Sequence, residues 1–234
     1  MDAALLNAGG FTPFSASDFP GKLAAVVFVQ GCAWRCGYCH NPGLQVRKGG
    51  RLAWSSLMEV LRRRAGLLDA VVFSGGEPTT DPALPAAMAA VRELGFQVGL
   101  HTACLYPQRL RAVLPLVDWV GFDIKAPFEH YAAITGAQGS GDKARTCAEL
   151  ILASGVDYEC RTTVHPAQLP PDMLRQLAHT LAAMGVQHYI LQEFRATGCA
   201  DTRLIASARP GYPEAALAAE LAPLFSRFEV RRPV

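Results

Sequence analysis

The sequence predicts an α/β fold, a partial (β/α)6 barrel of parallel strands with outer helices. Two observations support this prediction. Short apolar runs alternate with longer amphipathic stretches, and polar residues of chemical interest follow the apolar runs. Strands that alternate with helices favour a parallel sheet with right-handed crossovers. The same elements laid flat would form a doubly wound sheet, and in both arrangements ligands bind at the carboxyl ends of the strands.

Six short apolar runs are predicted as buried strands, because most of them are rich in Val, Ile, Phe or Tyr. They cover residues 24–30, 70–74, 97–101, 119–124, 158–164 and 188–193. The stretches between them carry apolar residues at helical spacing, at residues 54–66, 82–95, 107–116, 143–155 and 171–185. Six such strand–helix units give the TIM-like partial barrel.

Boundary residues agree with this order. Asp81 before Pro82 is typical of a helix N-cap followed by proline at the first helical position. Residues 136–141 (GAQGSG) predict a flexible loop, and residues 209–213 separate a final helix and strand. No composition typical of a linker interrupts the chain, so we expect one domain over residues 1–234. Three glycines stand where a helix would end before a strand: Gly95, Gly155 and Gly185.

The composition excludes several classes of protein. Half of the residues are hydrophobic and only 18% are charged, so the chain can bury a large core and does not resemble a disordered one. A formal net charge of +2 argues against broad electrostatic binding to nucleic acid or to an anionic membrane. We expect Arg231 and Arg232 to lie in a solvated polar tail.

The N-terminal segment, MDAALLNAGGF, lacks the basic and apolar regions of a secretory signal. The longest apolar stretch, residues 23–29, is far shorter than the ~20 residues that a membrane span requires. We therefore expect a cytoplasmic protein, in which seven cysteines, an odd number, are poor candidates for disulfides. Cysteines that cluster then indicate metal binding or catalysis.

Cys32, Cys36 and Cys39 follow the pattern C-x3-C-x2-C just after the first predicted strand, and three interpretations are open. Residues 36–40 (CGYCH) match the attachment motif of a c-type haem, although that attachment ordinarily takes place outside the cytosol. The three cysteines together with His40 could form a structural zinc site, although adjacent residues rarely bind the same ion. The third interpretation is a [4Fe–4S] cluster.

A cluster held by three cysteines has one iron atom without a protein ligand, because such clusters ordinarily use four cysteines. An open iron is a binding position for a ligand, just as an open coordination position makes a zinc site catalytic. The remaining cysteines are isolated along the chain and are expected to be small apolar core residues: Cys104, Cys147, Cys160 and Cys199.

Two motifs in this order resemble the signature of the radical S-adenosylmethionine superfamily. One is the cysteine pattern with Tyr38 before its last cysteine, and the other is Gly75-Gly76-Glu77-Pro78 after the second strand. The order of strands extends the resemblance over nearly the whole chain. The resemblance implies that the three cysteines hold a [4Fe–4S] cluster and act in catalysis through it. It further implies that the open iron binds S-adenosyl-L-methionine, which is cleaved reductively to a 5′-deoxyadenosyl radical.

The resemblance also implies which residues bind the cofactor. Gly75 and Gly76 have no side chains, so the end of their strand can approach the cofactor closely. Together with Glu77, this segment binds the ammonium group of the cofactor in the family. Tyr38 corresponds to a residue near the adenine, and Thr102, at the end of the third strand, joins the predicted cofactor-binding residues.

Charged residues at later strand ends extend this set. Asp123-Ile124-Lys125 resembles the D-x-K segment of glycyl-radical-activating enzymes. Alternate residues of a strand point the same way, so Asp123 and Lys125 can reach one pocket, where Lys125 would contact the carboxylate of the cofactor. Arg161 resembles the arginine of the fifth strand that contacts polar groups of the cofactor. Arg195 stands near strand six, where a relative has a histidine close to the cofactor.

The start of the chain resembles one subgroup of the superfamily. Residues 17–22 (SDFPGK), Gly31-Cys32 and residues 39–42 (CHNP) are similar to anaerobic ribonucleoside-triphosphate reductase activating proteins. This resemblance implies a partner, a glycyl-radical enzyme such as anaerobic ribonucleotide reductase, from which a glycine hydrogen is abstracted. It also implies a low-potential electron donor of the flavodoxin or ferredoxin type.

Two other functions are open, and one motif departs from a relative. A small-molecule radical enzyme similar to 7-carboxy-7-deazaguanine synthase shares the cluster and the size. An iron–sulfur protein for electron transfer or sensing would use the cluster without needing the Gly75–Glu77 segment. The segment His101-Thr102-Ala103-Cys104 stands where pyruvate formate-lyase activase has Asp-Thr-Asn-Gly, so the aspartate that binds a monovalent cation in that relative is absent.

Overall fold

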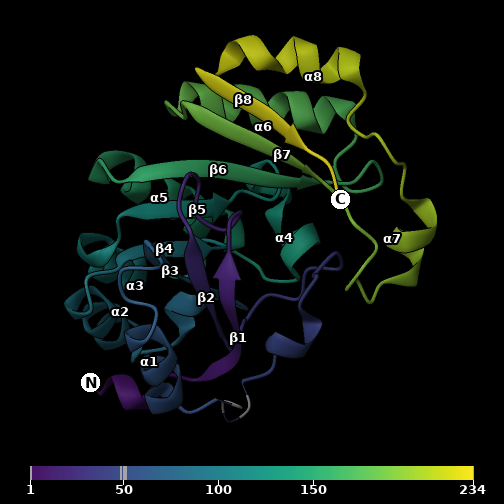
Figure 1. Ribbon diagram of the computed structural model, residues 1–234. Helices are drawn as coiled ribbons and strands as arrows, with labels where there is room; N and C mark the ends of the chain where they lie inside the picture. Colours follow the sequence, from purple (N-terminus) through teal and green to yellow (C-terminus); the bar gives the residue numbers. More distant parts are fainter. Residues whose placement is uncertain (1, 48, 50–51, 234) are drawn as a thin grey trace.

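The computed structural model describes residues 2–47, 49 and 52–233, and its strands form one eight-stranded sheet whose order follows the chain (Figure 1). Strand β1 pairs with β2 antiparallel, and every later strand is parallel to its predecessor. The six predicted strands are confirmed as β2 to β7. The strand bounds are β1 Ala8–Ser15, β2 Ala24–Val29, β3 Ala70–Gly75, β4 Gln97–Thr102, β5 Trp119–Asp123, β6 Asp157–Val164, β7 His188–Glu193 and β8 Arg227–Arg231.

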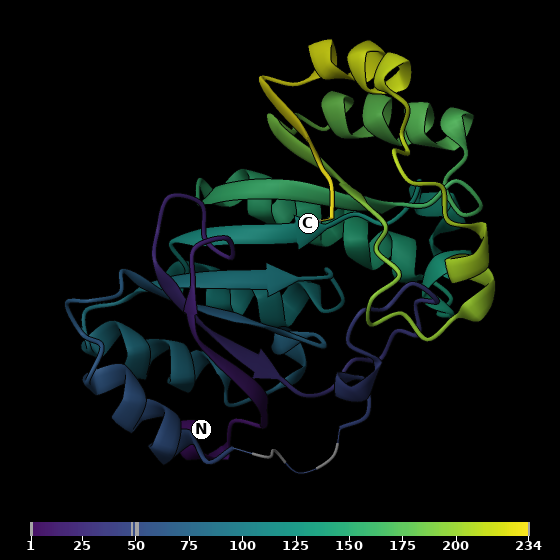
Figure 2. The ribbon, with the colours of Figure 1, turned by 45° about the vertical axis from the view of Figure 1, so that its right-hand side comes forward.

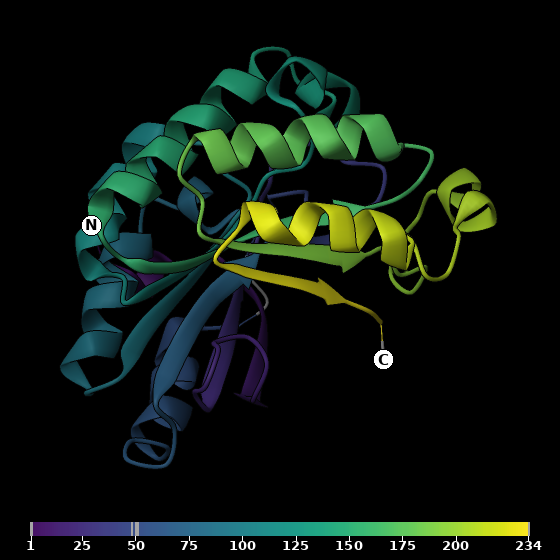
Figure 3. The ribbon, with the colours of Figure 1, turned by 90° about the horizontal axis from the view of Figure 1, so that it is seen from above.

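Most of the helices lie on the outer side of the curved sheet, and the short helix Thr202–Ser207 lies beyond the carboxyl ends of the strands, as the view from above shows (Figure 3). The five predicted helices are confirmed as α1, α2, α3, α5 and α6, with different ends. The bounds are α1 Trp54–Arg62, α2 Leu84–Glu93, α3 Pro107–Val113, α4 Tyr131–Thr135, α5 Ser140–Ser154, α6 Pro171–Ala183, α7 Thr202–Ser207 and α8 Ala215–Leu221. Sequence and structure therefore agree on a (β/α) barrel that is not closed by a β1–β8 pairing among the described residues.

Three boundary details differ from the prediction or refine it. The predicted loop 136–141 is wrong at its end, because Ser140 and Gly141 already belong to α5. Asp81 is not the N-cap of α2, which begins at Leu84, because a 3-10 turn over Pro78–Thr80 comes first. The Asp81 carboxylate instead accepts the Ala83 N–H at 2.9 Å. The three predicted helix-ending glycines all have positive φ, as a left-handed C-terminal residue requires.

Strand β1 was not predicted. It contains Gly9, Gly10 and Pro13, residue types that are depleted in strands. Proline cannot donate a ladder hydrogen bond and is tolerated at a sheet edge, which is where β1 lies. Strand β8, the predicted final strand, extends the sheet at its other edge.

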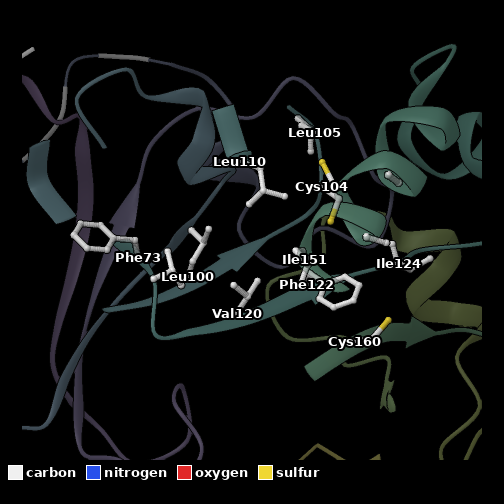
Figure 4. Packing of buried hydrophobic residues seen from close by; sticks show 14 of the residues in the cluster. Phe73, Leu100, Cys104, Leu105, Leu110, Val120, Phe122, Ile124, Ile151 and Cys160 are labelled. Carbon is white, nitrogen blue, oxygen red and sulfur yellow. The ribbon is translucent and has the colours of Figure 1, made fainter. Parts of the chain in front are cut away.

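Alternation along the central strands separates two faces of the sheet. Phe73, Leu100, Val120 and Phe122 point outward into the main core under the helices (Figure 4). Their neighbours in sequence point to the inner, concave face, which carries small, polar and charged side chains near the carboxyl ends of the strands. Burial of these outward-pointing side chains stabilises the fold by roughly 2 kcal/mol for each large apolar residue. Because side chains alternate along a strand, it also determines which residues face inward.

The lower part of the inner face is filled by the connection between β1 and β2. Phe19 from this segment packs on Trp119 with a ring distance of 5.2 Å and forms a small second core with Val26 and Val72. Of residues 17–22, part of the motif that resembles the reductase-activating subgroup, Phe19 is therefore buried against the inner face, whereas Ser17, Pro20 and Gly21 are exposed.

His101 links this connection to the end of β4. Its Nε2 donates to the Asp18 carbonyl oxygen at 2.9 Å, and its Nδ1 accepts from the Ser74 hydroxyl at 3.2 Å. A carbonyl can only accept, so the neutral ring carries its proton on Nε2. Burial, helped by the charge of Arg161, lowers the pKa of His101 to about 3.

The carboxyl end of β3 lies against the backbone that flanks the cysteine motif. A Cβ on Gly75, whose φ is +120°, would lie 2.3 Å from the Val29 carbonyl oxygen. A Cβ on Gly76 would lie 2.5 Å from the Gly31 carbonyl oxygen and 2.9 Å from that of Leu44. The glycines are therefore required by close packing of two backbone segments, a reason other than the predicted approach to a cofactor.

We predict that Gly76→Ala lowers the free energy of unfolding by about 1–3 kcal/mol, because backbone atoms must move to admit the added methyl group. Urea unfolding of the cluster-free protein measures this change. Gly43→Ala is the matched control, because a Cβ at Gly43 would meet nothing within 4 Å. Equal stability of both variants would contradict the packing argument.

We predict that His101 makes the stability of the cluster-free protein fall as the pH drops from about 6.5 toward 3. In this window the unfolded chain protonates the histidine and the folded chain does not, so stability rises with pH by about 1.4 kcal/mol per unit. Unfolding curves at several pH values should show a shallower dependence for His101→Gln. The exposed His179→Gln should keep the wild-type dependence, and an unchanged slope in His101→Gln would refute this assignment.

Candidate active site

A cavity of about 300 Å³ opens at the carboxyl ends of the parallel strands. Its wall includes ten of the twelve residues predicted to bind the cluster or the cofactor. They come from the loop after β2 and from the ends of β3 to β6, as expected for a parallel sheet. These residues are Cys32, Cys36, Tyr38, Cys39, Gly75, Gly76, Thr102, Asp123, Lys125 and Arg161.

The cysteine loop, residues 30–47, is closed at its base by backbone hydrogen bonds between its two ends. Gly31 N donates to Leu44 O at 2.7 Å and Cys32 N donates to Gln45 O at 3.0 Å, so the two ends of the loop lie side by side. Cys32, Cys36 and Cys39 are free and half-buried. Burial raises the pKa of Cys32 to about 11, so a metal that binds its thiolate must displace the proton.

Three charged side chains from β5 and β6 form an ion group on the cavity wall. Asp123 lies between two cations: its Oδ2 is 3.2 Å from Lys125 Nζ, and its Oδ1 is 3.1 Å from Arg161 Nε. Burial alone would raise the pKa of Asp123, but the charges of Lys125 and Arg161 outweigh it and bring the pKa below its usual value. The group has two cations and one anion, so its net charge favours an anionic ligand such as a carboxylate.

Tyr38 lies beside this group. Its ring centre is 5.7 Å from Lys125 Nζ, within range of a cation–π contact. The Tyr38 hydroxyl is buried and has no hydrogen-bond partner among the described residues. A buried polar atom without a partner is costly, so a bound ligand that hydrogen-bonds this hydroxyl would be stabilised.

Glu77 does not line the cavity. Its carboxylate is fully buried and accepts hydrogen bonds from Thr79 N at 3.1 Å, from Ala103 N at 2.8 Å and from the Thr102 hydroxyl at 3.0 Å. Burial raises its pKa, and these hydrogen bonds oppose the rise. The Glu77 carboxylate thus links the segment after β3 to the end of β4 through hydrogen bonds. Thr102, which does line the cavity, is one of its hydrogen-bond donors.

Arg195 also lies outside the cavity wall, in the exposed segment between β7 and α7. Its backbone carbonyl meets His40 Nε2 at 3.1 Å, and the His40 ring packs near Phe194 at 6.0 Å. Cys199 Sγ lies 3.5 Å from Gly37 O in the same region. Figure 2 shows this segment running beside the cysteine loop, so it covers the loop without adding a predicted side chain to the cavity.

The cavity wall contains further residues that were not predicted as site residues. Thr163 and Gln192 face one another across β6 and β7 and line the cavity. Thr163 follows Arg161 by two positions, so strand alternation was the signal that could have found it. Ser74, two residues after the inward-facing Val72, could have been found in the same way.

The described residues contain no three His, Cys, Asp or Glu side chains placed around a single metal ion. His40 Nε2 is directed at a backbone carbonyl. The part of the chain that the structure describes has no helix long and apolar enough to cross a membrane.

Comparison with known proteins places these residues in a family. The model of the radical SAM superfamily matches residues 26–181, which include the cysteine loop and the strand ends from β3 to β6. A putative glycyl-radical enzyme activating enzyme of Methanocaldococcus jannaschii is 30% identical over 196 residues, 79% of this chain and 78% of that protein.

Two further proteins show how far the likeness extends. The pyruvate formate-lyase-activating enzyme of Clostridium pasteurianum is 36% identical over 126 residues, so the match spans about half of each protein, 51% of this chain and 52% of the relative. The structure of SuiB of Streptococcus suis bound to the precursor peptide SuiA superposes with a TM-score of 0.69 at 12% identity, covering 88% of this chain and 48% of that one. That likeness concerns the fold. The family match and the M. jannaschii relative together show that this chain belongs to the radical SAM superfamily.

Proposed function

We propose that this enzyme generates a glycyl radical on a partner protein of the anaerobic ribonucleotide reductase type. The observation that carries the proposal is the cavity whose wall contains both the three cysteines and the ion group of Asp123, Lys125 and Arg161. The similarity to a putative glycyl-radical enzyme activating enzyme over most of both chains supports the type of substrate.

The superfamily uses a [4Fe–4S] cluster and S-adenosylmethionine, which are the cofactors predicted from the sequence. Cys32, Cys36 and Cys39 would hold the cluster, and the residues fit it, because three free thiols lie on the wall of one cavity and not around a single ion. When bound, the two cofactors together supply the one-electron chemistry that turns S-adenosylmethionine into methionine and a 5′-deoxyadenosyl radical.

The chain itself contributes orientation. Lys125 and Arg161 carry the charges that attract the carboxylate of S-adenosylmethionine, and Asp123 is the anion available to its ammonium group. Tyr38 offers a hydroxyl without a partner. Because these groups are fixed to strand ends and to each other, they are oriented before the ligand arrives, which lowers the cost of binding it.

The choice of partner rests on the start of the chain. Of the two segments that resemble reductase-activating proteins, residues 17–22 place Phe19 on the inner face of the sheet, and Cys39, His40 and Asn41 from residues 39–42 line the cavity. Thr163 on β6 and Gln192 on β7 also line its wall, and a peptide segment of the partner would lie against them. A donor of the flavodoxin or ferredoxin type would supply the electron.

We predict that anaerobically reconstituted protein, given dithionite and S-adenosylmethionine, releases 5′-deoxyadenosine. Cys36→Ala should reduce this product to the level of protein without a cluster, because one of three ligands is lost. Product is measured by chromatography. Cys199→Ala is the matched control, a half-buried cysteine near the same loop but outside the cavity wall, and it should keep wild-type activity. Absence of product from the wild type would refute the enzymatic proposal.

We predict that mixing the reconstituted enzyme with its cognate anaerobic reductase, S-adenosylmethionine and dithionite as the electron source gives a glycine-centred radical, detected by electron paramagnetic resonance. The signal should require S-adenosylmethionine and should disappear when the radical glycine of the reductase is replaced by alanine. Steady cleavage of S-adenosylmethionine without a glycine radical on any candidate partner would instead favour a small-molecule substrate.

A further inference from the structure

The ion group of the cavity continues across the inner face of the sheet to the last strand. Glu159, two residues before Arg161 on β6, is 1% exposed. Both of its oxygens accept hydrogen bonds from Arg231 on β8, at 2.7 and 2.9 Å. Arg231 was expected in a solvated tail, and that expectation is wrong, because a buried carboxylate fixes it to the barrel.

Arg161 stands between two carboxylates. Its Nε donates to Asp123 Oδ1 at 3.1 Å and its Nη2 donates to the Gly121 carbonyl at 3.0 Å, while its Nη1 is 3.8 Å from Glu159 Oε1. Asp123 thus holds the shorter contact. Glu159 is engaged on both oxygens by Arg231, which leaves Arg161 only a long contact with Glu159.

We propose that Arg231 is a positioning residue for the cofactor: by neutralising Glu159 it keeps Arg161 paired with Asp123 at the cavity wall. This inference rests on the proposed function in one respect, that S-adenosylmethionine is the ligand that Arg161 and Lys125 attract. Arg231 does not line the cavity and lies outside the part of the chain that the superfamily model matches. Through the charge of Arg231, β8 thereby contributes to the electrostatics of a site whose other charged residues come from β5 and β6.

The consequence of losing Arg231 follows from the same distances. Glu159 would be a buried carboxylate whose nearest cation is Arg161, and a buried charge without a partner is strongly unfavourable. The Arg161 guanidinium would then turn from Asp123 toward Glu159. The cavity would lose positive charge where the cofactor carboxylate binds, and Asp123 would keep Lys125 alone.

The test measures the dissociation constant of S-adenosylmethionine by anaerobic calorimetry on the cluster-loaded protein. Arg231→Gln should weaken binding on the order of tenfold, the change that about 1.4 kcal/mol produces. The double variant Glu159→Gln/Arg231→Gln removes the uncompensated charge and should restore binding to within about threefold of wild type. Arg231→Lys keeps the charge but not the paired geometry, so its dissociation constant should lie between those of Arg231→Gln and the double variant.

Arg232→Gln is the matched control. Arg232 is the next residue, and its guanidinium pairs at 2.5 Å with Glu193, another carboxylate with little exposure, away from Arg161. Its loss should leave the dissociation constant unchanged. An equal loss of affinity in Arg232→Gln, normal affinity in Arg231→Gln, or failure of the double variant to recover would each overturn the proposal.

A second readout needs neither cofactor nor cluster. No hydrogen bond or ion pair joins Asp123 to Arg231 among the described residues, so coupling between them must pass through Arg161 and Glu159. In the cluster-free protein, the shift of the unfolding midpoint caused by Asp123→Asn should shrink when Arg231 is already Gln. Additive shifts would overturn the proposal. If wild-type protein failed to bind S-adenosylmethionine, the proposed function would fall, while this cycle would still decide whether Arg231 positions Arg161.

Discussion

The close approach of two backbone segments, the end of β3 and the cysteine loop, is the constraint on which the rest of the site depends. Gly76 lies where any side chain would overlap the carbonyl oxygens of Gly31 and Leu44. Glu77 N then donates to Gly31 O at 2.8 Å. Because a rigid strand end supports the loop, its thiols are placed on the cavity wall by the sheet itself.

The inner face of the sheet supplies the second half of the site. Its upper part is polar because the apolar residues of each strand are committed to the helix-covered outer face. Charged side chains there cannot be left unpaired, so they form a continuous series from Lys125 through Asp123, Arg161 and Glu159 to Arg231. Within the series, only the first three line the cavity. The geometry of the three charged side chains on the cavity wall is therefore set partly by residues that do not line the cavity.

Much of this could be predicted from the sequence. The cysteine spacing, the glycine pair after a strand and the Asp-x-Lys alternation are local patterns, and strand order brings them to one end of a parallel sheet. Strand β1 could not be predicted, because Gly9, Gly10 and Pro13 obscure its period and only pairing with β2 makes it a strand. The structural roles of Glu77 and Arg231 could not be predicted from the sequence either. The sequence around a buried carboxylate that joins two strand ends does not differ from that around one that binds a ligand. Arg231 pairs with the exposed Glu229 nearby in sequence, but its buried partner, Glu159, lies 72 residues earlier.

The proposed chemistry requires that three thiolates leave one iron atom of the cluster free to bind S-adenosylmethionine. Electron paramagnetic resonance of the reduced protein, recorded before and after S-adenosylmethionine is added, addresses it most directly. We expect a [4Fe–4S] signal whose shape changes on addition, because the amino acid end of the ligand would bind the iron that no cysteine holds. A signal that stays the same, or protein that carries zinc in place of iron and sulfide, would contradict this requirement.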